Sequence, residues 1–278
     1  LIVDYQKIID EGVEGIISRI DGKIAGLGDL NTREKFDKYN FYQGVKMALE
    51  GLVAYAENHA KEAESLAAKC KDPVRKKELL EIARICRKVP RKPAETFREA
   101  MQSFWFAHVV LFIELNGRGI SPGRFDQYMY RTFKADWDSG NLTEQEALEL
   151  LELMRIKCSE ISRAHATFTE SYLGGSVYQN VTLGGCDRYG NPCDNELSKL
   201  VLQAGINVKT WQPTLSVRWR EDMNEEFKHK AIECIKAGSG YPALFNDTLA
   251  TERFIKTSGA SIEDARDWAP CGCVDMQI

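Results

Sequence analysis

The stretch Tyr178-Gln179-Asn180-Val181-Thr182-Leu183-Gly184-Gly185 decides the fold class, because it is a strand-forming run that ends in a glycine turn. A helical pattern follows at 194–206, and Thr214-Leu215-Ser216-Val217-Arg218-Trp219 predicts a second strand. Strands separated by helices of about ten to fifteen residues require parallel βαβ connections. The sequence therefore predicts an α/β fold built from βα units over residues 116–278.

Further elements continue this alternation. Apolar spacing predicts helices at 225–237 and 248–258, a helical turn from Ser261, and a short strand or loop at 241–247. Residues 1–115 are mainly helical in pattern, with helices expected at 3–20, 32–68, 73–87 and 96–115. Two more helices are expected at 126–137 and 144–161, the second opened by a Thr143 and Glu146 capping box.

Composition excludes several classes of partner. The formal charge of −4 provides no overall basic field, so we expect no nucleic-acid partner. The longest apolar run, 104–113, is too short to span a bilayer and is interrupted by His108, so we expect no membrane association. The eight cysteines are spread along the chain with no secretory leader, which favours reduced thiols and a cytoplasmic location.

The tail Ala269-Pro270-Cys271-Gly272-Cys273-Val274-Asp275-Met276-Gln277-Ile278 predicts a short buried strand. Alternate residues of a strand share a face, so Cys271, Cys273 and Asp275 are expected to point the same way. Burying a carboxylate beside thiols costs several kcal/mol unless it serves a purpose. The alternatives are a reactive cluster and a packed strand whose aspartate reaches solvent.

The loop 116–128 is the second candidate site. Its three glycines and one proline allow the backbone to approach another group closely, and Arg118 and Arg124 supply guanidinium forks. For Arg124 and Asp126 we favour structural roles, a pairing with a neighbouring carboxylate and a cap on the next helix. Arg118 lies between two glycines, where the chain is tight, and is the better candidate for a ligand.

A metal site is not expected. Cys186 and Cys193 have the spacing C-x6-C, and Cys271 and Cys273 have C-x-C, whereas zinc knuckles use C-x2-C. A zinc-stabilised module through these four thiols remains an alternative.

Several blocks resemble the pyruvate formate-lyase-like glycyl radical enzymes, in register over roughly 95–278. In chain order the blocks are Ser121-Pro122-Gly123-Arg124-Phe125-Asp126-Gln127-Tyr128, Gln179-Asn180-Val181-Thr182-Leu183-Gly184-Gly185, Asn195-Glu196-Leu197-Ser198, Gln212-Pro213-Thr214-Leu215-Ser216-Val217-Arg218, Phe245-Asn246-Asp247, Glu263-Asp264-Ala265-Arg266-Asp267 and Gly272-Cys273-Val274-Asp275. Each block alone is weak, and the set is specific.

The resemblance implies a helix-rich fragment of a ten-stranded α/β barrel in which Cys273, on a central loop, becomes a thiyl radical and abstracts hydrogen from substrate. The carboxylate of Asp275 would accept or donate a proton. Eliminating and decarboxylating relatives carry Glu at this position, and the side chain of Asp275 is one methylene shorter. Substrate contacts are expected from Arg118, Gly119, Tyr178 and Cys271, with Tyr172 in the same pocket-lining stretch. A guanidinium at Arg118 would suit an anionic substrate.

The resemblance also implies a dehydratase, lyase or decarboxylase that cleaves a C–O, C–C, C–N or C–S bond. Pyruvate formate-lyase proper has adjacent cysteines, whereas Gly272 separates the two here, which disfavours a formate C-acetyltransferase. Relatives of the glycerol dehydratase type carry His-Ser where this chain has Arg118-Gly119, which weakens a glycerol assignment. A non-catalytic α/β module remains an alternative.

The expected radical lies outside this sequence. The glycyl-radical motif Arg-Val-x-Gly-Tyr/Phe does not occur, and the chain starts without methionine and stops inside an apolar run, so residues 1–278 are expected to be a partial domain of a longer protein. No bound cofactor is expected. The resemblance implies a protein glycyl radical installed by a radical-SAM activating enzyme, a small-molecule substrate and a homodimer.

Overall fold

The computed structural model describes residues 1–162 and 177–278, so Tyr172 lies outside the described residues. These residues form two compact units. One unit comprises residues 4–110, and the other comprises residues 1–3 together with 111–278.

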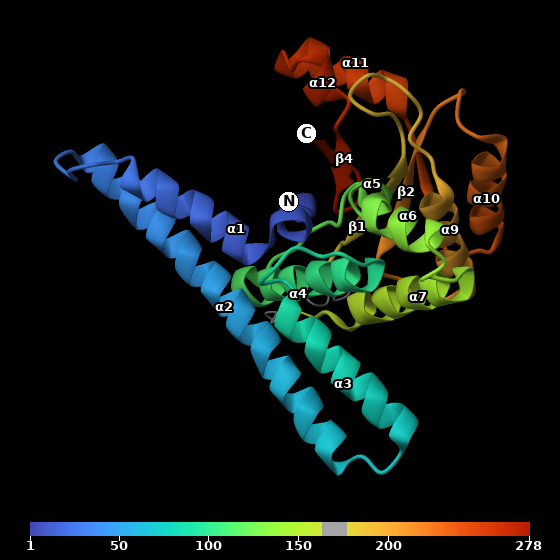
Figure 1. Ribbon diagram of the computed structural model, residues 1–278. Coiled ribbons are helices and arrows are strands. Elements are labelled where there is room, and N and C mark those ends of the chain that lie inside the picture. Colours follow the sequence, from blue (N-terminus) through green and yellow to red (C-terminus); the bar gives the residue numbers. More distant parts are fainter. Residues whose placement is uncertain (163–176) are drawn as a thin grey trace, which may run out of the picture. The chain divides into compact units, whose positions relative to one another are not determined.

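The unit 4–110 is helical, as the periodicity predicts. It contains α1 (Tyr5–Ala25), α2 (Arg33–Lys69), α3 (Pro73–Lys88) and most of α4 (Phe97–Leu115). Helix α3 lies beside the C-terminal part of α2, and α1 lies beside its N-terminal part (Figure 1). A stripe of small residues lets α2 bury one face, namely Ala56, Ala60, Ala63 and Ala67. His108, the polar residue within the apolar run of α4, can be buried because its Nδ1 forms a hydrogen bond with the buried hydroxyl of Tyr5 at 2.6 Å.

The unit with residues 111–278 alternates helices and strands. Its elements are α5 (Phe125–Tyr128), α6 (Tyr130–Asp138), α7 (Glu144–Glu160), β1 (Asn180–Gly184), α9 (Glu196–Asn207), β2 (Thr214–Trp219), α10 (Glu225–Lys236), β3 (Ala243–Asn246), α11 (Asp247–Ser258), α12 (Ile262–Ala265), β4 (Ala269–Cys271) and β5 (Asp275–Gln277). The predicted capping box of α7 is confirmed, since Thr143 and Glu146 bond each other's backbone N–H groups.

The predicted parallel sheet is confirmed. Its order is β1-β2-β3, and both pairings are parallel, with Asn180 opposite Thr214 and Ser216 opposite Ala243. Strand β1 and the central residues of β2 are buried, as expected for strands that are covered on both faces. Gly123 forms a further parallel bridge to Val181, so the loop before α5 extends the sheet beyond β1.

The prediction of a single tail strand is wrong, because the tail is an antiparallel hairpin. Strand β4 pairs with β5, and Cys271 lies opposite Asp275. Gly272 takes a φ of +61°, a left-handed conformation that turns the chain and that glycine adopts without strain. Gly272, Cys273 and Val274 therefore form the loop at the hairpin tip, and Cys273 no longer shares a strand face with Cys271 and Asp275.

Among the helices of the described residues, none combines the length and apolarity that crossing a membrane requires.

Candidate functional site

The loop 116–123 runs beside the start of β1. The Gly119 N–H donates to the Val177 carbonyl at 2.8 Å, and the Thr182 N–H donates to the Gly123 carbonyl at 2.7 Å. Gly119 and Gly123 both have positive φ, so the loop follows a path that most side chains would strain. These bonds place Arg118 against the residues that enter β1.

The backbone N–H and carbonyl groups of Gly272 bind the β4–β5 hairpin to this loop and to β1. The Gly272 N–H donates to Ser121 Oγ at 3.0 Å, and Asn180 Nδ2 donates to the Gly272 carbonyl at 3.3 Å. Ser121 Oγ also accepts the Asn180 N–H at 3.2 Å. The Cys271 thiol donates to the Gly119 carbonyl at 2.9 Å. The loop, β1 and the hairpin therefore meet at one place.

Two glycines allow this close approach. A Cβ on Gly119 would lie 3.6 Å from Cys271 Sγ, and a Cβ on Gly272 would lie 3.9 Å from Gly119 Cα. Both residues have φ between +60° and +70°, so a side chain at either position costs backbone strain although space is available. The predicted Gly119 thus belongs to the site through its backbone.

Arg118 is the candidate ligand group. Its guanidinium carbon lies 5.7 Å from the centre of the Tyr178 ring, a distance typical of a cation–π contact. Its Nε and Nη2 atoms are buried and have no hydrogen-bond partner among the described residues. Buried guanidinium donors are normally satisfied, so these two N–H groups suit an anionic acceptor from outside the chain.

The structure brings four predicted residues together, Arg118, Gly119, Tyr178 and Cys271. Cys273 and Asp275 belong to the same hairpin, but in this chain both are exposed, contrary to the expected buried cluster. Cys273 is exposed because it lies at the hairpin tip. Asp275 is the cross-strand partner of Cys271, and its Oδ2 accepts a hydrogen bond from Gln277 at 3.0 Å.

Arg124 has its predicted structural role, but the predicted cap by Asp126 is wrong. Arg124 Nη1 pairs with Asp267 Oδ1 at 2.8 Å. The N-cap residue of α5 is Arg124, and no side chain caps this helix end. Asp126 lies inside the helix, and its Oδ2 accepts the Gly184 N–H at 2.8 Å and the Ser198 hydroxyl at 2.6 Å. Burial raises the pKa of Asp126.

No group of three or more His, Cys, Asp or Glu side chains within residues 1–162 and 177–278 is arranged to hold a metal ion. All eight cysteines are free thiols. Burial raises the pKa of the Cys186 thiol and raises that of Cys193 to about 11.

Sequence reasoning assigned no role to Ser121 and Asn180. Both side chains are almost fully buried, at 0% and 2% exposure, and together they hold the Gly272 peptide. Each lies inside a sequence block that resembles the family, and this membership is the signal from which a role for them could have been predicted. Their bonding to a hairpin about 90 to 150 residues away follows only from the tertiary structure.

The chain with this sheet and hairpin matches the solved structure of a glycyl radical enzyme from Archaeoglobus fulgidus, with a TM-score of 0.92 at 35% identity over 100% of this chain and 36% of that one. Its fold is therefore that of a part of the α/β barrel of glycyl radical enzymes. The whole chain, residues 1–278, matches the family described as "Pyruvate formate lyase-like". The chain belongs to that family, and the predicted fold class is confirmed.

Three relatives show the range of the family. The chain is 36% identical to a (2S)-3-sulfopropanediol dehydratase of Klebsiella oxytoca, over 100% of this chain and 34% of the relative. It is 37% identical to an indoleacetate decarboxylase of Tractidigestivibacter scatoligenes, over 97% and 30%. A solved B12-independent glycerol dehydratase from Clostridium butyricum, in its glycerol-bound form, matches with a TM-score of 0.95 at 36% identity, over 100% and 35%. The chain spans about a third of the length of these relatives.

Proposed function

We propose that the full-length protein carrying this sequence is a glycyl radical enzyme of the dehydratase, lyase or decarboxylase type. The observation that carries the proposal is the hairpin that holds Cys273 at its tip and bonds through Gly272 and Cys271 to the loop of Arg118. The sulfur of Cys273 would give up its hydrogen atom, take one from a substrate C–H bond, and return it after the C–O, C–C, C–N or C–S bond has broken. Membership of the family supports this chemistry.

The radical would be a backbone glycyl radical that lies outside residues 1–278 and is installed by a radical-SAM activating enzyme. It supplies the vacancy for the hydrogen atom of Cys273. This chain's part is to keep the Cys273 thiol in place and to orient the substrate C–H bond. The positive φ of Gly272 and the two hydrogen bonds to its peptide serve the first task.

Asp275 would accept or donate the proton that accompanies bond cleavage. It starts β5, two residues after Cys273, so the carboxylate and the thiol belong to one short hairpin. The Asp side chain withdraws the carboxylate by about 1 Å or more relative to a Glu. We expect Asp275→Asn to lower kcat by about 100-fold or more in the activated protein and Asp275→Glu to retain more activity than Asp275→Asn.

The substrate would be a small metabolite with an anionic group held by Arg118. The two unsatisfied buried N–H groups of Arg118 support a carboxylate or a sulfonate. Because hydrogen bonds to charged groups contribute about 1.5–3 kcal/mol, Arg118→Met should raise KM for an anionic substrate by at least about tenfold and leave neutral diols unaffected. Arg188→Met is the matched control, since exposed Arg188 lies over the Tyr189 ring at 5.8 Å.

The decisive test is turnover of the anaerobically activated full-length protein against diols, amines, sulfonates and arylacetates. Cys273→Ala should abolish turnover and leave the fold intact, whereas Cys70→Ala, a thiol in the other compact unit, should leave turnover unchanged. Wild-type turnover in Cys273→Ala would reject the proposal. Acetyl transfer to formate would establish the transferase alternative, and no glycyl radical after activation would establish a non-catalytic module.

We propose that the protein acts in the cytoplasm and forms a homodimer. The free state of all eight cysteines supports a reducing compartment. Sedimentation of the full-length protein tests the dimer, and a monomer at working concentration would contradict it.

A further inference from the structure

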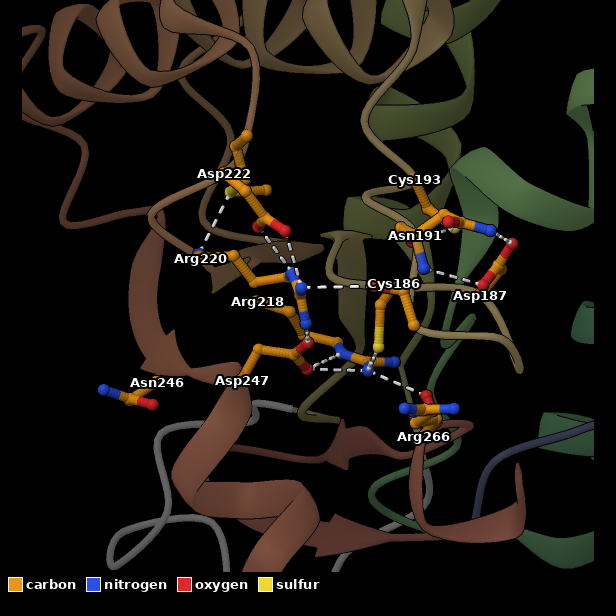
Figure 2. Close-up of polar contacts among 12 residues, drawn as sticks. Cys186, Asp187, Asn191, Cys193, Arg218, Arg220, Asp222, Asn246, Asp247 and Arg266 are labelled. Atoms are coloured by element: carbon orange, nitrogen blue, oxygen red, sulfur yellow. Dashed lines mark hydrogen bonds and ion pairs between the residues drawn. The ribbon is translucent and has the colours of Figure 1, made fainter. Parts of the chain in front are cut away.

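Arg218 and Asp247 form a completely buried ion pair. Both side chains are 0% exposed, and Arg218 Nη2 lies 2.6 Å from Asp247 Oδ1. Arg218 Nε donates to the same oxygen at 2.7 Å. Arg218 belongs to β2 and Asp247 is the first residue of α11, so the pair joins two separate elements, as Figure 2 shows.

The remaining contacts of this pair reach the segment that leads into the hairpin. Arg218 Nη1 donates to the Trp268 carbonyl and Nη2 donates to the Arg266 carbonyl, each at 2.8 Å. The Trp268 indole N–H donates to Asp247 Oδ1 at 3.0 Å, and the Trp268 ring centre lies 4.6 Å from the guanidinium carbon. Trp268 directly precedes β4, so the carbonyl, N–H and ring of one residue are all held by this pair.

Stability alone does not explain this arrangement. Burial, with a further contribution from the nearby Arg124 guanidinium, lowers the pKa of Arg218, which shows that burying its charge costs free energy. A buried ion pair is often no more stabilising than apolar residues of the same size. Its distinctive property is that a planar guanidinium with directed N–H groups permits few geometries.

Neighbouring residues complete the geometry. A Cβ on Gly185 would collide with the Arg218 guanidinium, so glycine at the end of β1 leaves the room that Arg218 occupies. Arg220 Nη1 reaches the second oxygen of Asp247 at 3.3 Å, and Arg220 Nη2 pairs with Asp222 Oδ2 at 2.8 Å (Figure 2). Both carboxylate oxygens of Asp247 therefore have cationic partners, which satisfies the buried charge.

We propose that Arg218 and Asp247 are a positioning pair that fixes the hairpin stem, residues 266–268, which leads into β4. By fixing the stem, the pair also fixes the position of the Cys273 thiol. The pair acts through backbone carbonyls of the stem and touches no reacting atom. The effect of the Arg218–Asp247 pair on turnover rests on the proposed function, but its effect on the position of the hairpin does not.

The test is hydrogen exchange of the full-length protein, wild type against Arg218→Lys. A lysine ammonium group lacks the planar fork of the guanidinium and cannot bond the carboxylate and both carbonyls together, so charge-assisted hydrogen bonds to the hairpin stem are lost. We expect exchange in residues 269–277 to become at least about tenfold faster, while β1, residues 180–184, exchanges as in the wild type. In the activated enzyme we expect kcat to fall about 100-fold with KM within about threefold, as for a misplaced reacting group.

Asp267→Asn is the matched control, because Asp267 lies in the same stem and its ion pair with Arg124 has 76% of the Asp267 side chain exposed. Asn keeps an oxygen that can accept from Arg124 Nη1, and the exposed Asp267 carboxylate is screened by solvent, so exchange should change by less than about twofold. If Arg218→Lys fails to fold, Trp268→Phe removes the indole N–H that bonds Asp247 and shrinks the buried ring that lies over Arg218, while the Arg218–Asp247 pair itself is kept, and it should accelerate hairpin exchange alone.

The proposal is overturned if hairpin exchange in Arg218→Lys matches that of Asp267→Asn, or if all peptides accelerate equally. In the fallback variant, wild-type hairpin exchange would overturn it equally. Absence of turnover in the wild type would count against the proposed function. The hydrogen-exchange result would still test the positioning role of Arg218 and Asp247.

Discussion

Replacing Ser121 by alanine should release the hairpin from the loop of Arg118. Ser121 Oγ is the single acceptor of two backbone N–H groups, that of Gly272 at 3.0 Å and that of Asn180 at 3.2 Å. A hydroxyl oxygen has two lone pairs, so both bonds form at once. Ser121→Ala leaves two donors unsatisfied in a region where Ser121 itself is 0% exposed.

The expected cost is set by those two donors. Each buried donor that loses its acceptor costs about 1–3 kcal/mol, and partial relaxation of the loop brings the sum to about 2–4 kcal/mol. Since about 1.4 kcal/mol corresponds to a factor of ten, the Gly272 and Asn180 amides should exchange roughly 30- to 700-fold faster than in the wild type.

Hydrogen exchange measured by NMR or mass spectrometry gives the assay, and Ser216→Ala provides the control. Ser216 is also 0% exposed, lies in β2 of the same unit, and its Oγ has no partner among the described residues. Its replacement removes the same atom without orphaning a donor. If exchange at Gly272 in Ser121→Ala is no faster than in Ser216→Ala, the assigned role of Ser121 is wrong.

Three further predictions test the site and its surroundings. Gly272→Ala should lower the free energy of unfolding by about 1–2 kcal/mol from its φ of +61° alone, and Gly140→Ala, at φ +73° in open space, by the same amount; urea unfolding that shows a loss above about 3 kcal/mol at Gly272 alone would contradict the contact geometry. Burial raises the pKa of Asp126 above its ordinary 3.8, so its contribution to stability is fully present below that value and is lost as pH rises through the raised one. The free energy of unfolding of the wild type relative to Asp126→Asn should therefore increase as pH falls from about 7 to about 4, and a difference independent of pH would refute the shift. Zinc titration followed by calorimetry should give no stoichiometric uptake through Cys186 and Cys193, and uptake that disappears in Cys193→Ser would restore the zinc alternative.

Local sequence rules are sufficient to predict the helices and strands and their order along the chain. Alternating apolar runs and glycine turns suffice to predict parallel strands joined by helices, because hydrophobic periodicity and caps act within a few residues of the chain. The Thr143 capping box and the strands at 180–184 and 214–219 follow from such local rules. The family resemblance also predicts that Arg118, Gly119, Tyr178 and Cys271 contact the substrate, and the structure places these four residues together.

The hairpin shape of the tail, and the contacts that hold it, depend on long-range packing. Sequence periodicity predicts that Cys271, Cys273 and Asp275 lie in one strand. The chain instead turns at Gly272, whose positive φ is stabilised by hydrogen bonds with the distant residues Ser121 and Asn180. The burial of Arg218 beside Asp247 likewise depends on where β2, α11 and the hairpin stem meet. Such long-range pairings leave no periodic trace in the chain, because their free energy arises only when distant segments share a desolvated space.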